Sequence, residues 1–185
     1  MLITEFLNAK EYYRYGDWLG QQDDETRQMY FGTAGGLGLI ESLIDRIEQE
    51  PSKHHFLIIK NCDGWLGTLH IAELSDKSIE FGIIVKKELR GEGIGSQLIE
   101  EGITWARNRG YTELYMHCLT WNLAIKHLCV KHGLKVRTID TDSEVQIHLN
   151  PPTWITVQKE INYKNRNLWH TFLQDSQFLF QEIYG

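Results

Sequence analysis

The sequence predicts an α/β fold in which helices flank a β-sheet, and three observations support this. Apolar residues in the first fifty positions recur three and four residues apart, as in amphipathic helices. From His55 onward they follow one another or alternate with polar residues, as in strands. Between residues 81 and 109 a strand pattern passes through a glycine-rich turn into a helical pattern. The length of 185 residues predicts one domain over 1–150 and a C-terminal extension over 151–185.

Two helices are expected before the first strand, over 11–19 and 37–48, with a loop of turn-forming residues at 32–36 between them. Strands at 56–59, 65–74 and 79–85, joined by turns near 61–64 and 75–77, then form an antiparallel meander. The remaining expected elements are a helix over 96–109 ended by Gly110, a strand over 113–119, a helix over 122–132 ended by Gly133, extended chain at 134–136 and a strand over 144–149.

The extension begins where Pro151 and Pro152 break the chain. Residues 154–183 are rich in aliphatic and aromatic side chains at helical spacing, so we expect a helical segment. Two interpretations stay open: an arm that forms a homodimer, and a segment that packs back on its own domain.

Composition excludes several classes of function. The formal net charge of −6 and the pI near 5.7 argue against binding of nucleic acid, which needs a clustered excess of Lys and Arg. This charge would weakly favour a cationic substrate. No apolar run reaches the roughly 20 residues that cross a bilayer, and the first residues lack a basic secretory start. A cytoplasmic protein without membrane contact is therefore expected.

Cysteine and histidine placement gives no support for a metal site. The three cysteines, Cys62, Cys118 and Cys129, are too widely spaced for a zinc knuckle and are expected to be free thiols. His127 and His132 are five residues apart, which places them on different sides of a helix. We therefore expect no bound metal.

The segment from Arg90 to Ser96, Arg-Gly-Glu-Gly-Ile-Gly-Ser, has the composition of an anion-binding loop. Glycines allow backbone N–H groups to converge on a phosphate, and the N-terminus of the following helix adds about half a positive charge. The spacing matches neither the GxxxxGK of a P-loop nor the GxGxxG of a dinucleotide site. The alternative interpretation is a glycine turn with only a structural role.

These residues resemble the GNAT superfamily of N-acetyltransferases, whose signature is Arg or Gln, two residues, Gly, one residue, then Gly or Ala. Here Arg90, Gly93 and Gly95 match it, and a second block is similar to residues 122–134, an Asn followed by a helix that ends in Gly. The resemblance covers about residues 55–149. It implies a mixed, mostly antiparallel sheet and acetyl-CoA as cosubstrate, bound between the fourth and fifth strands of the family fold.

The resemblance also implies the residues that hold acetyl-CoA. Backbone groups near the end of the fourth strand would bind the pantetheine, the loop amides would bind the pyrophosphate, and an Asn would contact the pantetheine or acetyl end. The expected cofactor-binding residues are Ile83, Ile84, Val85, Arg90, Gly91, Glu92, Gly93, Ile94, Gly95, Ser96 and Asn122. Asn122 also fits a plain helix cap.

In this family the amine attacks the thioester directly, without a covalent enzyme intermediate. Glu80 is the candidate general base because it interrupts an apolar strand and matches a Glu common in the family; a structural or substrate-anchoring role is the alternative. A main-chain N–H near Val85 would stabilise the oxyanion. The family often places a Tyr seven residues after the Asn as general acid, but this chain has Cys129 there. Cys129 is therefore the candidate acid, or an inert buried thiol, with Tyr115 or water as other donors.

The expected function is acetyl transfer from acetyl-CoA to a primary amine of a small molecule or peptide. The alternative is a GNAT-like domain that binds acyl-CoA as a sensor or scaffold with little or no turnover. The resemblance implies that the first two helices and their loops select the substrate. Candidate pocket residues there, which fit core packing equally well, are Trp18, Arg27, Tyr30 and Phe31.

Overall fold

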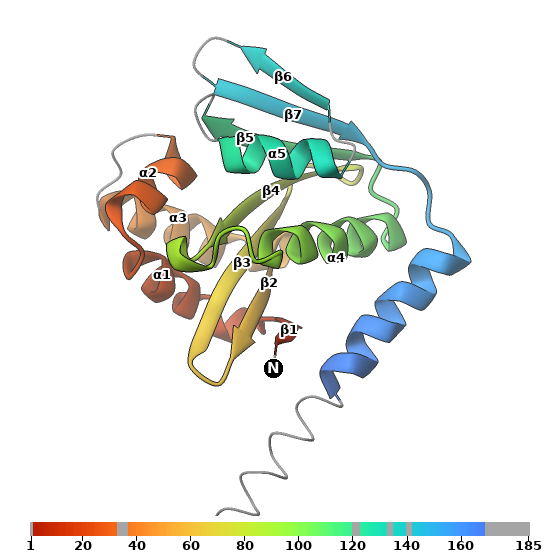
Figure 1. Ribbon diagram of the computed structural model, residues 1–185, viewed down its shortest axis with the longest axis horizontal. Helices are drawn as coiled ribbons and strands as arrows, with labels where there is room; N and C mark the ends of the chain where they lie inside the picture. The colour runs from red at the N-terminus through yellow and green to blue at the C-terminus, as the bar shows by residue number, and fades with distance from the viewer. Residues whose placement is uncertain (1, 33–36, 120–122, 133–134, 140–141, 169–185) are drawn as a thin grey trace, which may run out of the picture.

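A computed structural model describes residues 2–32, 37–119, 123–132, 135–139 and 142–168 of the chain. Its centre is a seven-stranded sheet in the order β1-β2-β3-β4-β5-β7-β6 (Figure 1). The strands are β1 (Ile3–Phe6), β2 (His54–Asn61), β3 (Gly64–Glu73), β4 (Ser78–Val85), β5 (Glu113–Leu119), β6 (Lys135–Ile139) and β7 (Asp142–His148).

The sheet is mixed and mostly antiparallel, as predicted. Every neighbouring pair is antiparallel except β4 and β5, which are parallel because a helix connects them. The parallel pairing is short: Ser78–Glu80 align with Glu113–Tyr115, whereas β4 continues to Val85 and β5 to Leu119. The two strands therefore part after Glu80 and leave a wedge between them.

Helices cover both faces of the sheet. They are α1 (Tyr13–Gly20), α2 (Asp24–Phe31), α3 (Leu37–Gln49), α4 (Ile94–Asn108) and α5 (Leu123–Lys131), and residues 154–168 are also helical. Helix α4 packs on one face against β2, β3 and β4, while α1 and α3 pack together on the other (Figure 1). None of the described helices is long and apolar enough to cross a membrane.

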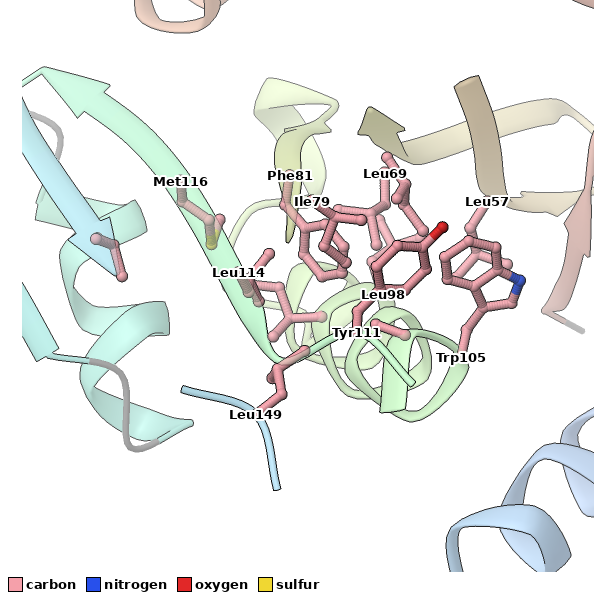
Figure 2. Packing of buried hydrophobic residues seen from close by; sticks show 14 of the residues in the cluster. Leu57, Leu69, Ile79, Phe81, Leu98, Trp105, Tyr111, Leu114, Met116 and Leu149 are labelled. Carbon is pink, nitrogen blue, oxygen red and sulfur yellow. The ribbon is translucent and has the colours of Figure 1, made fainter. Parts of the chain in front are cut away.

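Each face of the sheet has its own hydrophobic core, because side chains alternate along a strand. Ile79 and Phe81 of β4 point toward α4 and pack with Leu98 and Trp105 (Figure 2). Ile84 belongs to the opposite core, with residues of α1 and α3. Because Ile84 faces α1 and α3, the other even-numbered residues of β4 face the same side. Glu80 is one of them.

Two elements near the N-terminus differ from the sequence prediction of two helices and no strand. Strand β1 has only four residues, too few for a recognisable alternation, and it pairs with β2 at the edge of the sheet. Helix α2 is short and largely polar, so its apolar pattern is weak. Its N-cap is Asp23, whose carboxylate accepts a hydrogen bond from the Thr26 N–H at 3.1 Å. That capping pattern was the signal available in the sequence.

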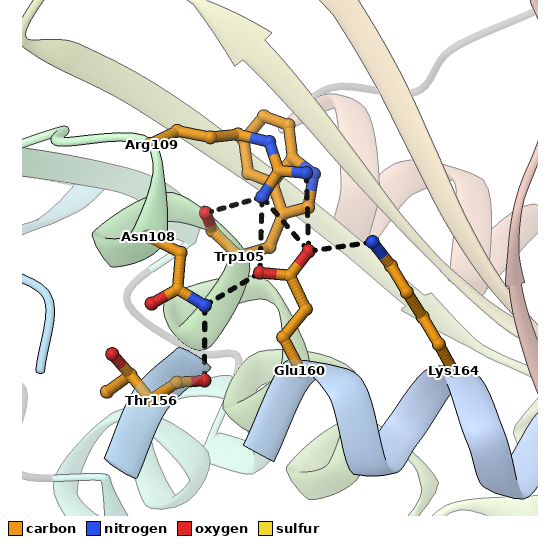
Figure 3. Close-up of polar contacts among 6 residues, drawn as sticks. All are labelled: Trp105, Asn108, Arg109, Thr156, Glu160 and Lys164. Atoms are coloured by element: carbon orange, nitrogen blue, oxygen red, sulfur yellow. Dashed lines mark hydrogen bonds and ion pairs between the residues drawn. The ribbon is translucent and has the colours of Figure 1, made fainter. Parts of the chain in front are cut away.

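The helix over 154–168 packs against α4 of its own chain (Figure 3). Asn108 donates to the Thr156 carbonyl at 3.1 Å and to Glu160 at 2.7 Å, and the Arg109 guanidinium lies 3.3 Å from the same Glu160 carboxylate. The described part of the extension thus contacts its own domain. Trp154 is 79% exposed, and residues 169–183 of the expected segment lie outside the described residues.

Candidate functional site

A continuous cleft of about 1370 Å³ extends along the wedge between β4 and β5. One end is lined by the glycine loop before α4 and by residues of α5. The other end lies on the α1–α3 side of the sheet, among side chains of α2, α3, β2, β3 and β4. The cleft therefore joins the predicted phosphate loop to the predicted base on β4.

The glycine loop has the backbone geometry of an anion site. Gly91 and Gly93 have φ angles of 91° and 86°, in the left-handed region that glycine adopts without strain. Gly93 is the N-cap of α4, and no described side chain caps this helix end. The first backbone N–H groups of α4 are therefore available to an anion, in the positive field of a 15-residue helix.

The structure brings most of the predicted cofactor residues to this cleft. Those that line it are Ile83, Ile84, Val85, Arg90, Gly91, Gly93, Gly95 and Ser96. Glu92 is exposed outside the lining, and the Ile94 side chain is in the core at 5% exposure, so these two offer only backbone groups. Asn122 lies outside the described residues.

The Arg90 side chain is directed toward α2. Its guanidinium donates to the Thr26 hydroxyl at 2.6 Å and, through Nε, to the Val85 carbonyl at 3.4 Å. Thr26 in turn donates to the Asp23 carboxylate, and this hydrogen bond is the main cause that lowers the Asp23 pKa. Arg90 thus connects the glycine loop to the start of α2, a contact between segments 64 residues apart that the sequence pattern did not show.

A second contact fixes the first turn of α4. The Ser96 hydroxyl lies 2.8 Å from Nε2 of His132, just after α5. Burial lowers the pKa of His132, which favours the neutral ring beside the loop. His127 and Lys131 also line this part of the cleft.

At the other end of the cleft, a chain of hydrogen bonds crosses the sheet face. Tyr15 donates to the Tyr30 oxygen at 2.9 Å, Tyr30 lies 3.4 Å from Nδ1 of His70, and His70 Nε2 lies 2.9 Å from Nδ1 of His54. Because Tyr15 donates to Tyr30, the Tyr30 proton is free to point at His70 Nδ1. The His70 proton then sits on Nε2 and faces His54.

The pKa values of both histidines in this hydrogen-bond network are lowered. Burial is the main cause that lowers the pKa of His70 to about 3. His70 also stacks on Phe56, with ring centroids 4.5 Å apart. Burial lowers the pKa of His54 as well. Two imidazoles without charge therefore form the floor of this half of the cleft.

Glu80 lies where β4 and β5 begin to part. It aligns with Ala72 of β3 and with Tyr115 of β5, and its half-buried side chain lines the cleft. Its charge raises the pKa of Tyr30, although burial is the larger cause of that rise to about 12. Glu80 is thus close to the tyrosine–histidine chain. The Cys129 side chain lies outside the described residues, so the candidate acid has no described position.

Of the four residues predicted to line a substrate pocket or pack the core, two line the cleft. Tyr30 and Phe31 of α2 do so, and Tyr30 packs closely on β4: a Cβ added at Gly82 would lie 2.9 Å from its ring. Trp18 is buried beside Trp65, and Arg27 donates to the carbonyls that precede α2. Trp18 and Arg27 therefore have structural positions.

The sequence match agrees with this geometry. The family described as the acetyltransferase (GNAT) family matches residues 12–134, about two thirds of the chain. The chain belongs to the GNAT acetyltransferase family. The match spans α1 to the end of α5, and therefore includes the glycine loop, the wedge and Glu80.

Solved structures share the GNAT fold at low sequence identity. The GNAT domain of S. lividans PAT aligns with a TM-score of 0.66 and 15% identity, over 79% of this chain and 89% of that one. Spermidine N-acetyltransferase from Vibrio cholerae, in complex with CoA and spermine, aligns with a TM-score of 0.62 and 15% identity, over 80% and 95%. Campylobacter jejuni PseH, in complex with acetyl coenzyme A, aligns with a TM-score of 0.55 and 16% identity, over 81% and 100%. A comparison with curated proteins finds no significant match.

Proposed function

We propose that this GNAT domain is an acetyl-CoA-dependent N-acetyltransferase that acts on a primary amine of a small molecule or peptide. The observation that carries the proposal is the single cleft that joins the uncapped N-terminus of α4 to Glu80 through the wedge between β4 and β5. In this proposal residues 1–150 form the acetyltransferase domain and residues 151–185 an extension of it.

The described residues fit a pyrophosphate and an extended thiol arm. Gly91 and Gly93 present backbone without side chains, and the α4 amides lack a cap. Beyond Glu80 the edge of β4 is not paired with β5, so it offers backbone groups to a ligand that lies in the wedge. The Vibrio and Campylobacter structures were solved with CoA and acetyl coenzyme A, which supports the same ligand class here.

Acetyl-CoA, when bound, supplies an acetyl group activated as a thioester. In the proposed reaction Glu80 accepts one proton from the ammonium form of the acceptor, and the neutral amine attacks the acetyl carbonyl. The carbon–nitrogen bond forms and the carbon–sulfur bond breaks. The second amine proton is then lost, and the leaving thiolate is protonated to give CoA thiol. Cys129 remains our candidate for that acid.

Glu80→Gln tests the base separately from cofactor binding. Wild type and variant should show the same rise in melting temperature with acetyl-CoA, because Glu80 is remote from the glycine loop. Release of CoA thiol, measured over a panel of primary amines, should fall at least about 100-fold in the variant. Glu50→Gln is the matched control, since Glu50 lines the same cleft but pairs with Lys53.

Each outcome has a distinct meaning. No rise in melting temperature at millimolar acetyl-CoA would contradict the cofactor assignment. A rise without turnover of any amine would favour the acyl-CoA sensor. Full activity of Glu80→Gln would show that Glu80 is not the base.

A further inference from the structure

Several charged side chains line the cleft, and they differ in whether another side chain of the protein contacts them. Glu50 pairs with Lys53 at 2.5 Å, and Glu73 lies 2.9 Å from Nε2 of His55. Arg90, at the loop end, donates to α2. Each of these groups already has a side-chain partner within the protein, so none of them depends on a ligand for a polar contact.

Among the residues that the structure describes, two charged side chains at this end have no such partner. Arg46, in the last turn of α3, and Glu80, on β4, both line the cleft. Neither side chain forms a hydrogen bond or ion pair with any residue that the structure describes. Lys131 has no such partner among the described residues either, but it is the last residue of α5, next to the His132 that contacts Ser96. The acceptor half therefore presents one free cation and one free carboxylate, counted over the described residues.

Tyr30, which lines the same cleft, is affected by both charges. The Tyr30 pKa is raised by burial above all, but the Glu80 charge also raises it and the Arg46 charge lowers it. His54 and His70 line this half of the cleft too, and their lowered pKa values favour the neutral rings. A ligand in this space would meet an isolated positive group and an isolated negative group.

We infer that the acceptor is a zwitterion of the amino-acid class, with its amine at Glu80 and its carboxylate at Arg46. The inference rests on the proposed function and names the substrate class of that same site. A guanidinium binds a carboxylate through two parallel hydrogen bonds, and its charge persists at any pH the protein survives. An ammonium group opposite Glu80 is placed for the proton transfer that precedes attack.

The assignment of the two ends follows from the chemistry of the reaction. The reacting nitrogen must lie near the thioester, and Glu80 lies where β4 and β5 begin to part, whereas Arg46 belongs to α3. A plain amine would leave Arg46 without a counter-charge. Amino acids should therefore be better acceptors than the amines obtained by removing their carboxyl group.

The test compares acceptors that differ only in the carboxylate, such as L-lysine with cadaverine and L-ornithine with putrescine. CoA thiol release gives kcat/KM for each, and binding is measured in parallel by thermal shift in the presence of CoA. In the wild type the amino acid should be favoured about tenfold to hundredfold. Arg46→Gln should abolish that preference, because it should lower kcat/KM for the amino acid about tenfold to hundredfold more than kcat/KM for the plain amine. Arg46→Lys should restore part of it.

Arg14→Gln is the control for loss of one positive charge, because Arg14 is an exposed arginine outside the cleft. Equal kcat/KM and equal thermal shifts for amino acid and amine, in wild type and Arg46→Gln alike, would overturn the inference. If acetyl-CoA still raised the melting temperature and an amine were still acetylated, the proposed function would stand. Failure of acetyl-CoA to bind would instead contradict the proposed function itself.

Discussion

The role of Gly93 in ligand binding can be tested separately from its role in folding. Its φ of 86° lies in the left-handed region, yet a Cβ there would meet nothing within 4 Å. A side chain at this position would therefore cost backbone strain, and it would project into the space where an anion meets the α4 amides. Gly110, at the other end of α4, has a φ of 82° and equally open surroundings.

We predict that Gly93→Ala and Gly110→Ala lower the free energy of unfolding by similar amounts, about 1–2 kcal/mol, because both place an L-residue in the left-handed region. Only Gly93→Ala should weaken acetyl-CoA binding. Chemical denaturation measures the first effect, and the rise in melting temperature with acetyl-CoA measures the second. Equal ligand affinity in the two variants would show that the glycine loop has only a structural role.

Residue contacts also explain why α2 belongs to the site. In its first turn Thr26 accepts a hydrogen bond from Arg90 and donates one to the N-cap Asp23. Its last turn carries Tyr30, which contacts β4 and lies 3.4 Å from His70. One short helix thus touches both the phosphate end and the acceptor end of the cleft. Changes in α2 are expected to affect both ligands.

At the scale of elements, Glu101 of α4 connects three segments that are far apart in the chain. The carboxylate is only 6% exposed; it accepts hydrogen bonds from Gln97 at 2.9 Å, from Thr4 of β1 at 3.4 Å and from Arg166 of the C-terminal helix at 2.8 Å. Burial raises the Glu101 pKa, and the Arg166 charge opposes this rise. The extension therefore supplies a counter-charge for a buried carboxylate beside the edge strand.

We predict that Arg166→Ala lowers the free energy of unfolding at pH 7 by about 1–3 kcal/mol, because a buried carboxylate loses a charged partner. The loss should shrink as pH falls, since a protonated Glu101 no longer needs that partner. Urea denaturation at pH 7 and pH 5 measures both effects. Lys164→Ala, on the same helix but paired with Glu160, is the control. A loss of stability that does not depend on pH would contradict this role of Arg166.

For the whole molecule, the neutral histidine pair makes stability depend on pH. The folded-state pKa of His70 is about 3, below its ordinary value of 6.5. Between these two values the unfolded chain binds a proton that the folded protein does not bind. This contribution is therefore fully present above pH 6.5 and is lost as pH falls toward 3.

We predict that the wild-type free energy of unfolding declines below pH 6.5 with a slope that approaches about 1.4 kcal/mol per pH unit for this one proton. His70→Gln removes the titrating ring, so its slope between pH 6 and pH 4.5 should be smaller by about that amount. Urea denaturation at several pH values gives both slopes. His148→Gln is the control, because His148 is exposed on β7. Parallel slopes in wild type and His70→Gln would exclude this source of pH dependence.

The sequence alone determined the features that depend on neighbours in the chain. The alternation from Ile79 to Val85, the glycines between Arg90 and Ser96, and the apolar stripe of α4 predict strand, anion loop and helix, because backbone conformation and amphipathic period are local properties. The mixed sheet followed from the family resemblance carried by those residues. Strand β1 and helix α2 were missed because a four-residue edge strand and a polar helix have little local signal.

Only the tertiary structure decided which side chains share the cleft. Tyr30 meets His70 across 40 positions, and Thr26 meets Arg90 across 64. The register of β2, β3 and β4 and the packing of α2 and α3 on one face of the sheet bring these residues together in space. The same packing leaves the Arg46 and Glu80 side chains in one cleft without an ion-pair partner among the described residues. Such pairings have no periodic pattern, because each depends on where the sheet places residues that are distant in the chain.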